Sequence, residues 1–279
     1  MGLLAVEVSR FGVIMSADSQ PVELVDRETR VLAQAGNPRT RDPILTRDAG
    51  GFTGFTGFVG TEMIGSVTTR EWLTTFGTNH ADESLSAYAS ALGDELTQQW
   101  RRLGLSSVLE ILISGVEDGE VRFWFVRNSQ GLYDDDWTYK PPRTEFCVVD
   151  DLDGRHIPQD LVPGQTKEDL LRERIYSFRQ GALLPGAEVF DAFSRILLVI
   201  YTHRVDGFDP TASLEDLAYF ARQRMEFLKR LYSDKHGIYK KAPPPLGGVV
   251  HVFGVTLDRE IWKYPKIRDQ ARPTRAGST

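Results

Sequence analysis

The sequence predicts an α+β protein, built as a four-layer αββα sandwich in a single domain. Strand hairpins occur at the start, in the middle and near the end of the chain, which indicates antiparallel sheets. The predicted helices fall in pairs between those hairpins, which argues against a parallel α/β sheet. Two packed sheets with a helical layer on each outer face would bury every amphipathic stripe.

The strands are predicted from apolar or alternating segments bounded by turn residues. The clearest hairpin joins residues 108–113 to 121–126 through Asp118-Gly119, because Asp-Gly supplies the positive φ angles of a tight turn. Residues 51–60 read GFTGFTGFVG and predict a buried strand with a bulge. The polar residues 28–42 predict a loop. Further strands are expected at residues 3–8, 11–17, 249–256 and 260–264, and near Phe146.

Helices are expected at residues 61–76, 82–103, 187–203 and 213–232. The last of these begins at Ser213, whose hydroxyl can cap the helix opposite Asp216. The segment 82–103 carries the longest apolar stripe, spaced for one helix face. That stripe consists of Leu85, Tyr88, Leu92, Leu96, Trp100 and Leu103.

The domain organisation follows from where these patterns stop. Residues 128–173 are polar and contain runs of aspartate and proline, so they are predicted to be a surface insertion. Residues 1–127 and 174–266 are predicted to form the single domain around it. Residues 267–279 are predicted to be a flexible tail.

Composition limits the classes of function. The net charge of −6 argues against a nucleic-acid binder, which usually presents a basic face. No apolar run approaches the roughly 20 residues that span a bilayer, and the N-terminus lacks a signal-peptide pattern, so a cytoplasmic protein without membrane contact is expected. The single cysteine, Cys147, lies in an apolar segment and is expected to be a buried, inert thiol.

Motifs for cofactors and metals are weak. The glycine repeat of residues 51–60 could cradle a phosphate at a helix N-terminus, but it lacks a P-loop ending and phenylalanines fill its spaces, so a core strand is favoured. The acidic runs in 134–136 and 150–153 lack EF-hand spacing and are typical of solvated loops. The five histidines are far apart, and no Gly-x-Ser-x-Gly motif occurs. Neither a metal nor a cofactor is expected.

Four segments resemble the proteasome-type, 20S β-like branch of the N-terminal-nucleophile (Ntn) hydrolases. Residues 11–19, FGVIMSADS, are similar to the second-strand signature of that family. Residues 56–62 resemble its glycine-rich strand end, residues 112–119 its central hairpin, and residues 246–252 the double-glycine entry to a late strand. The segments occur in the family's order, so the chain is identified as a divergent member, outside residues 128–177.

The resemblance implies a catalytic N-terminal threonine, serine or cysteine, which attacks an amide with help from its own α-amino group. Counted back without gaps from Asp18, that position falls on Met1 or Gly2, and neither has a nucleophilic side chain. The closest cation to the position of the family's lysine is Arg41, which stays charged and cannot act as a tuned base.

Of the other catalytic positions, only the aspartate after the second strand is matched, by Asp18. The supporting serine falls at Gln180, and the aspartate and serine before the double glycine fall near Pro243 and Leu246. Asp18 and Arg41 are therefore vestigial candidates for a catalytic role. For Asp18, accepting backbone hydrogen bonds at a strand end is favoured over orienting a reactive site.

The function implied by this resemblance is that of a catalytically silent, proteasome-like subunit, a pseudoenzyme of the threonine peptidase family, in a ring or stacked-ring assembly. Its expected partners are copies of itself or other proteasome-like subunits. Two alternatives stay open. One is a threonine-peptidase-like amide hydrolase with a relocated catalytic set, and the other is a self-assembling scaffold protein.

Overall fold

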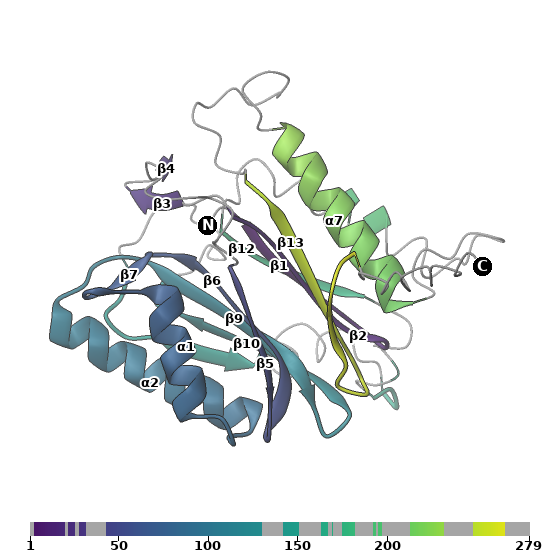
Figure 1. Cartoon of the computed structure of the whole chain (residues 1–279), viewed down its shortest axis with the longest axis horizontal. Coiled ribbons are helices and arrows are strands. Elements are labelled where there is room, and N and C mark those ends of the chain that lie inside the picture. The colour runs from purple at the N-terminus through teal and green to yellow at the C-terminus, as the bar shows by residue number, and fades with distance from the viewer. Residues whose placement is uncertain are drawn as a thin grey trace, which may run out of the picture.

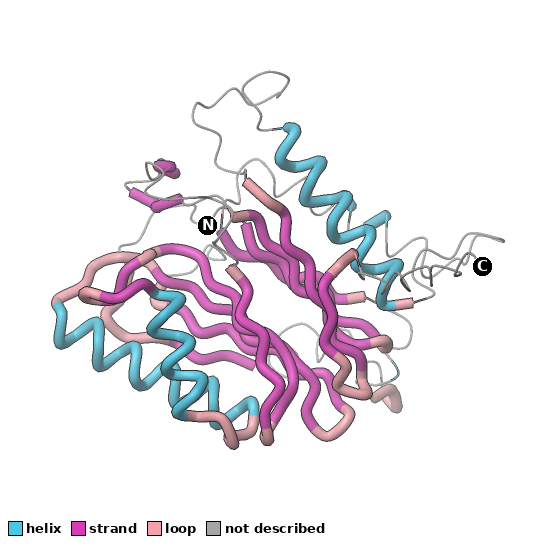
Figure 2. The backbone as a smooth tube through the Cα atoms, in the orientation of Figure 1, coloured by secondary structure: helices cyan, strands magenta, loops and turns pink. Residues whose placement is uncertain are grey.

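The computed structural model describes two five-stranded antiparallel sheets that face each other, with helices outside them (Figures 1 and 2). The description covers residues 3–19, 22–25, 28–31, 43–129, 142–150, 163–166, 169, 175–181, 192–193, 195–196, 213–231 and 248–265.

The first sheet has the strand order β12-β1-β2-β13-β14. Its bounds are β1 Leu3–Ser9, β2 Gly12–Asp18, β12 Tyr176–Gly181, β13 Val250–Thr256 and β14 Ile261–Lys263. Both β1 and β2 are buried along their whole length, because one side faces the second sheet and the other faces a helix. The predicted strand pair at the start of the chain is confirmed.

The second sheet has the order β11-β10-β9-β6-β5. Its bounds are β5 Ile44–Ala49, β6 Phe52–Gly60, β9 Leu109–Glu117, β10 Glu120–Arg127 and β11 Cys147–Asp150. The predicted central hairpin is confirmed, since Asp118 and Gly119 take φ angles of 51° and 77° between β9 and β10. The glycine repeat forms the core strand β6, as favoured above.

Two short hairpins lie outside the main sheets. They are β3 Val22–Val25 with β4 Glu28–Val31, and β7 Met63–Ile64 with β8 Val67–Thr68. The predicted loop over 28–42 is therefore wrong at its start, where residues 28–31 pair with 22–25.

The core between the sheets is packed closely near the start of β1. A Cβ atom on Gly57 of β6 would lie 2.7 Å from Leu4 Cδ1 and 2.9 Å from Met15 Sδ, so glycine is what lets the sheets approach here. Further along, the rings of Phe123 and Phe178 stack with centroids 4.3 Å apart. The two sheets thus share one apolar layer.

Helices α1 (Thr69–Asn79) and α2 (Leu85–Leu103) cover the outer face of the second sheet (Figure 1). The predicted stripe of α2 is buried from Leu85 to Trp100, but Leu103 is 39% exposed in the last turn. Helix α1 begins eight residues later than its predicted start at residue 61, because residues 63–68 form the β7–β8 hairpin and Thr68 caps the helix. None of the described helices is long and apolar enough to cross a membrane.

Helix α7 (Leu214–Leu231) packs on the outer face of the first sheet through Leu217, Ala221, Met225 and Leu228. The predicted cap is confirmed, because Asp216 N donates to Ser213 Oγ over 3.2 Å. The helix expected at residues 187–203 lies mostly outside the described residues.

The prediction of a four-layer αββα sandwich is wrong. The described part of the chain is dominated by antiparallel sheets and gives bounds for three helices, two on one outer face and a single one on the other. The prediction depended on a helix pair on each face, and only α7 fills the second of these layers among the described residues. The fold class is α+β with antiparallel sheets.

Strand β11 lies inside the predicted insertion 128–173 and pairs with β10 at the edge of the second sheet. Cys147, at the start of this edge strand, is exposed, so the predicted buried thiol is wrong. An apolar segment does not bury every side chain when its strand has a neighbour on one side only. The division of the chain into domain, insertion and tail stays a prediction.

Candidate functional site

The first sheet brings three strand ends together at the start of β1. Leu3 opens β1, Asp18 ends β2, and Val250 opens β13 directly opposite Asp18. Figure 1 shows the N-terminus at this same end of the sheet. An N-terminal nucleophile would lie here, so this strand-end site, made of Leu3, Asp18, Ser19, Val249 and Val250, is the candidate functional site.

Asp18 is fully buried and its carboxylate holds the backbone of β1. Leu3 N donates to Asp18 Oδ1 over 2.7 Å. A buried carboxylate is costly unless it accepts hydrogen bonds, and an edge of backbone amides at a strand end provides them. The bond is the structural interaction favoured for Asp18 from the sequence, while any catalytic role for Asp18 stays a prediction.

Ser19 continues the pairing of β2 with β13 by one residue. Its backbone N–H donates to Val249 O over 3.0 Å, and its hydroxyl accepts from Val249 N over 2.8 Å. The side chain thereby replaces a ladder hydrogen bond at the point where β13 begins. The sequence carried a signal for this contact, since Asp-Ser at a strand end is typical of side chains that bind nearby backbone.

A row of four residues crosses the first sheet just inside the strand ends. Gln180 pairs with Leu4, Leu4 with Ala17, and Ala17 with His251. Leu4 and Ala17 belong to the core between the sheets, and strand alternation places Gln180 and His251 on that same face. Gln180 is 2% exposed, and its Nε2 has no hydrogen-bond partner among the described residues.

The two ends of this row differ in character. Gln180, at the position where a serine is expected, offers an amide that can donate and accept hydrogen bonds but cannot act as a nucleophile. At the other end, His251 Nδ1 lies 3.4 Å from Lys263 Nζ. The ammonium of Lys263 also lies 4.9 Å from the ring centroid of Phe253.

The second sheet contributes a buried acid to the same end of the molecule. Glu110 pairs with Val59, two residues beyond the Gly57 contact with Leu4, and alternates with Leu112 of the shared core. Burial raises the pKa of Glu110, although a hydrogen bond from Ser129 and the charge of Arg127 act in the opposite direction. Sequence reasoning missed this pair.

The other predicted site positions cannot be placed. Arg41, Met1, Gly2, Pro243 and Leu246 lie outside the described residues. Nearby, the described chain resumes at Pro43, which is buried just before β5. Within the described residues, no group of three or more metal-ligating side chains is found.

Taken together, the polar groups at the strand-end site bind backbone. The Asp18 carboxylate is occupied by the Leu3 amide, and the Ser19 hydroxyl by the Val249 amide. These contacts fix where three strands begin and end.

Comparison with known proteins gives a likeness of fold. No protein-family model and no curated protein matches the chain. Among solved structures, the chain is similar to the Anbu (Gly-1) mutant from Hyphomicrobium sp. strain MC1, with a TM-score of 0.50 and 13% sequence identity. The match covers 97% of this chain and 89% of that one.

This comparison corrects the identification made from sequence motifs. The solved structure that the chain resembles is Anbu, so the specific assignment to the 20S β-like branch is wrong. Short glycine-rich motifs mark strand ends that related folds share, and they do not separate one branch from another. At 13% identity the similarity shows a likeness of fold to the Anbu structure and nothing about activity.

Proposed function

We propose that this chain is a catalytically silent subunit of an Anbu-like assembly. The observation that carries the proposal is the 2.7 Å hydrogen bond from Leu3 N to Asp18 Oδ1. It fixes the start of β1 at Leu3, and the residue joined to Leu3 is Gly2, which has no side chain. The chemistry of an N-terminal nucleophile requires an oxygen or a thiol at that point.

The residues at the family's other catalytic positions also support a catalytically silent chain. The position expected for the supporting serine is occupied by Gln180, so a nucleophile introduced before Leu3 would still lack that hydroxyl. In the sequence, Arg41 is the cation closest to the position where the family has the lysine that lowers the pKa of the nucleophile. A guanidinium does not give up its proton near neutral pH, so Arg41 could not take that role.

The assembly part of the proposal comes from the fold. The sequence motifs resemble those of proteasome subunits, and proteasome particles combine active and inactive subunits of one fold, so a silent chain of this kind would lie among active or identical neighbours. The expected partners are copies of this chain or other proteasome-like subunits in a ring.

Activity assays test the silent state. We expect no turnover of fluorogenic peptides above blank and no mass increase after treatment with a threonine-directed epoxyketone or vinyl sulfone. An Asp18→Asn variant is the matched control, since it removes the charge at the site while keeping the shape of the side chain. Turnover that disappears in Asp18→Asn would overturn the silent state, and so would labelling of the first residue.

Light scattering tests the assembly. At micromolar concentration we expect the purified chain alone to have a mass that is a multiple of 31.4 kDa, or a preparation that keeps its copurifying subunits to have a mass well above 31.4 kDa. A mass of 31.4 kDa both for the chain alone and for the preparation with copurifying subunits would contradict the assembly proposal. It would not affect the proposal that the chain is catalytically silent, which the activity assays test separately.

A second candidate function, an amide hydrolase with a relocated catalytic set, is favoured by one observation. The Ser129 hydroxyl donates to the buried Glu110 carboxylate beside the core between the sheets. Peptide mapping after probe treatment separates the two proposals. Modification of Ser129 that is lost in Glu110→Gln would support the hydrolase, while an unmodified chain supports the silent subunit.

A further inference from the structure

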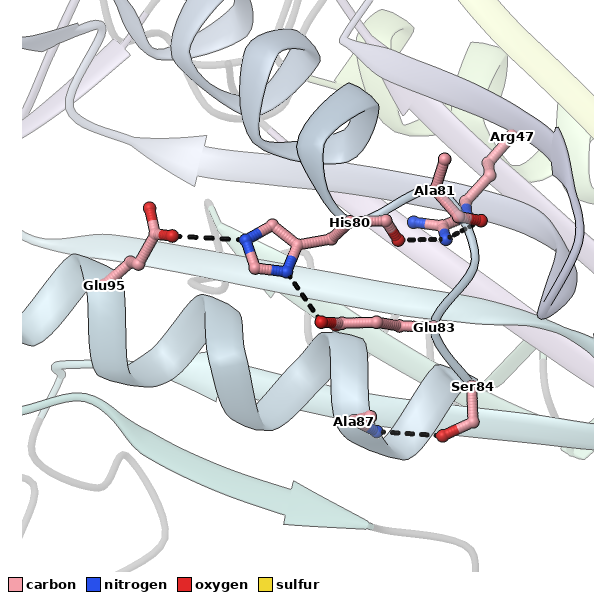
Figure 3. Close-up of polar contacts among 7 residues, drawn as sticks. All are labelled: Arg47, His80, Ala81, Glu83, Ser84, Ala87 and Glu95. Carbon is pink, nitrogen blue, oxygen red and sulfur yellow. Dashed lines mark hydrogen bonds and ion pairs between the residues drawn. The ribbon is translucent and has the colours of Figure 1, made fainter.

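The connection between α1 and α2 is organised around His80, on the outer face of the second sheet (Figure 3). His80 ends α1, because its backbone N–H donates to Phe76 O over 3.1 Å. Its ring stacks on the Phe76 ring with a centroid separation of 4.1 Å. The imidazole is thereby held in one orientation, with 19% of the side chain exposed.

Both ring nitrogens of His80 lie against carboxylates. Nδ1 is 2.8 Å from Glu83 Oε1 in the connection, and Nε2 is 3.1 Å from Glu95 Oε1 on α2 (Figure 3). A neutral imidazole carries one N–H, whereas the imidazolium carries two. Both contacts are therefore hydrogen bonds to ionised carboxylates only when His80 is protonated.

The backbone beside the ring is anchored independently of that proton. Arg47 Nη2, from β5, donates to His80 O over 2.6 Å and to Ala81 O over 2.7 Å. The guanidinium carbon lies 4.3 Å from the Phe52 ring centroid and 4.4 Å from that of Tyr88. Arginine stays charged across the usual pH range, so this anchor does not change when His80 titrates.

The charged groups that act directly on the His80 ring are Glu83 in the connection and Glu95 on α2. Arg47 of β5, which binds the backbone of the connection, itself lies among Asp82, Glu83 and Tyr88. At the start of α2, Glu117 of β9 accepts from Leu85 N over 3.0 Å. Burial lowers the pKa of His80, but the hydrogen bonds and charges of Glu83 and Glu95 outweigh it and raise the pKa above its usual value.

We propose that His80 is a proton-operated latch between α1 and α2. In the protonated state the ring holds the connection through Glu83 and the second helix through Glu95. Loss of the proton leaves one N–H for two carboxylates, so one of them is released, while Arg47 keeps the connection on the sheet. The α1–α2 pair therefore loosens at its His80 end as pH rises, whatever the chain's enzymatic activity.

The direction of the effect follows from linkage. The pKa of His80 is higher in the folded state than in the unfolded chain, where it is about 6.5. The stabilisation is therefore fully present below that unfolded value, and it is lost as pH rises through the folded value. The latch is closed in mildly acidic solution and open in alkaline solution.

Hydrogen exchange of residues 77–87 tests the latch in the full chain. After correction for intrinsic exchange rates, we expect protection of this segment to fall roughly tenfold between pH 6 and pH 8.5, the value of one charge-assisted hydrogen bond. The His80→Gln variant should show low protection at both pH values. The central hairpin β9–β10 should keep the same protection throughout and serves as the internal reference.

A second measurement keeps the proposal testable if His80→Gln fails to fold. NMR titration of the His80 ring, assigned by comparison among the histidines, should give a higher pKa in the native chain than in the double variant Glu83→Gln/Glu95→Gln. An equal pKa in the two proteins would overturn the latch. Protection of residues 77–87 that is independent of pH in the native chain would overturn it as well.

Discussion

Glu7 and Arg224 are charged residues in places where the sequence pattern calls for apolar ones. Glu7 lies in β1 with 0% exposure, and Arg224 lies on the buried face of α7 with 1% exposure. Their side chains form a hydrogen-bonded ion pair across 217 positions of sequence. Burial lowers the pKa of Arg224. The pair joins α7 to the first sheet in the middle of an otherwise apolar contact.

Removing one member of this pair should be costly. Glu7→Gln leaves a buried guanidinium without its counter-charge, so we expect a loss of about 3–5 kcal/mol in the free energy of unfolding. The double variant Glu7→Gln/Arg224→Met should recover much of that loss, because no buried charge remains. Urea unfolding of the three proteins measures both values. Equal stability of Glu7→Gln and the native chain would show that the charges are not paired in solution.

Replacing glycine by alanine should change the stability of the protein in opposite directions at positions 57 and 77. Gly57→Ala places a Cβ against Leu4 and Met15, so we expect about 1–3 kcal/mol of destabilisation from overpacking between the sheets. Gly77→Ala lies within α1 and meets only Tyr88 Oη at 3.5 Å, so we expect stabilisation of roughly 0.5–1 kcal/mol. Thermal unfolding of both variants checks the signs. A stabilising Gly57→Ala would contradict the close approach of the sheets.

At the scale of elements, helix starts are set by capping residues more than by apolar periodicity. Helix α1 begins where Thr68 Oγ1 accepts from Glu71 N over 3.1 Å and Glu71 Oε2 accepts from Thr68 N over 3.1 Å. The sequence predicts a helix start at residue 61, but residues 63–68 form the hairpin of β7 and β8. A reciprocal cap thus decides between two structures that the apolar pattern allows.

The stabilising role of a helix cap can be tested at the start of α7. Ser213 Oγ accepts from Asp216 N and donates to Asp216 Oδ2 over 2.7 Å. We expect Ser213→Ala to destabilise the chain by about 1 kcal/mol, because an amide of the first turn loses its partner. Thr75→Ala, on the exposed face of α1, should stay within about 0.5 kcal/mol of the native chain. Chemical denaturation of both variants gives the comparison, and equal values would contradict the role of the cap.

At the scale of the whole molecule, the two sheets are tied together away from the strand-end site. Arg259, in the turn between β13 and β14, donates from Nε to Thr53 Oγ1 over 2.8 Å and from Nη2 to Ala49 O over 3.2 Å. These contacts join the first sheet to the β5–β6 hairpin of the second. The strand-end site lies at the other end of β2 and β13, where Asp18 and Ser19 hold the strand ends.

The predicted surface insertion, residues 128–173, can also be tested on the whole molecule. We expect limited proteolysis to cut first within residues 128–173, because that segment is polar and contains Pro141-Pro142 and runs of aspartate. Mass spectrometry of the early fragments locates the cuts. Protection of the whole segment equal to that of β9 and β10 would contradict its assignment as a surface insertion.

The sequence by itself determined the features that depend on neighbouring residues. Two adjacent short strand segments predicted the β1–β2 pair, Asp118-Gly119 predicted the central hairpin, and Ser213 predicted the start of α7. At the strand-end site it pointed to Asp18 and to the backbone hydrogen bond that this residue accepts. The turn at Asp118-Gly119 and the cap at Ser213 are set within a few positions along the chain, and the contacts between β1 and β2, including the bond from Leu3 to Asp18, lie within one hairpin of adjacent strands, so a local pattern is sufficient to predict them.

Tertiary structure alone decided the contacts between distant segments. The pairing of Glu7 with Arg224, the carboxylates on both sides of His80, and the burial of Glu110 beside Ser129 all join separate elements. The exposure of Cys147 and the number of helices on each sheet also depend on which strand lies at an edge and which face is covered. Such contacts are fixed by how the elements pack, and a one-dimensional pattern records only which face of each element is apolar.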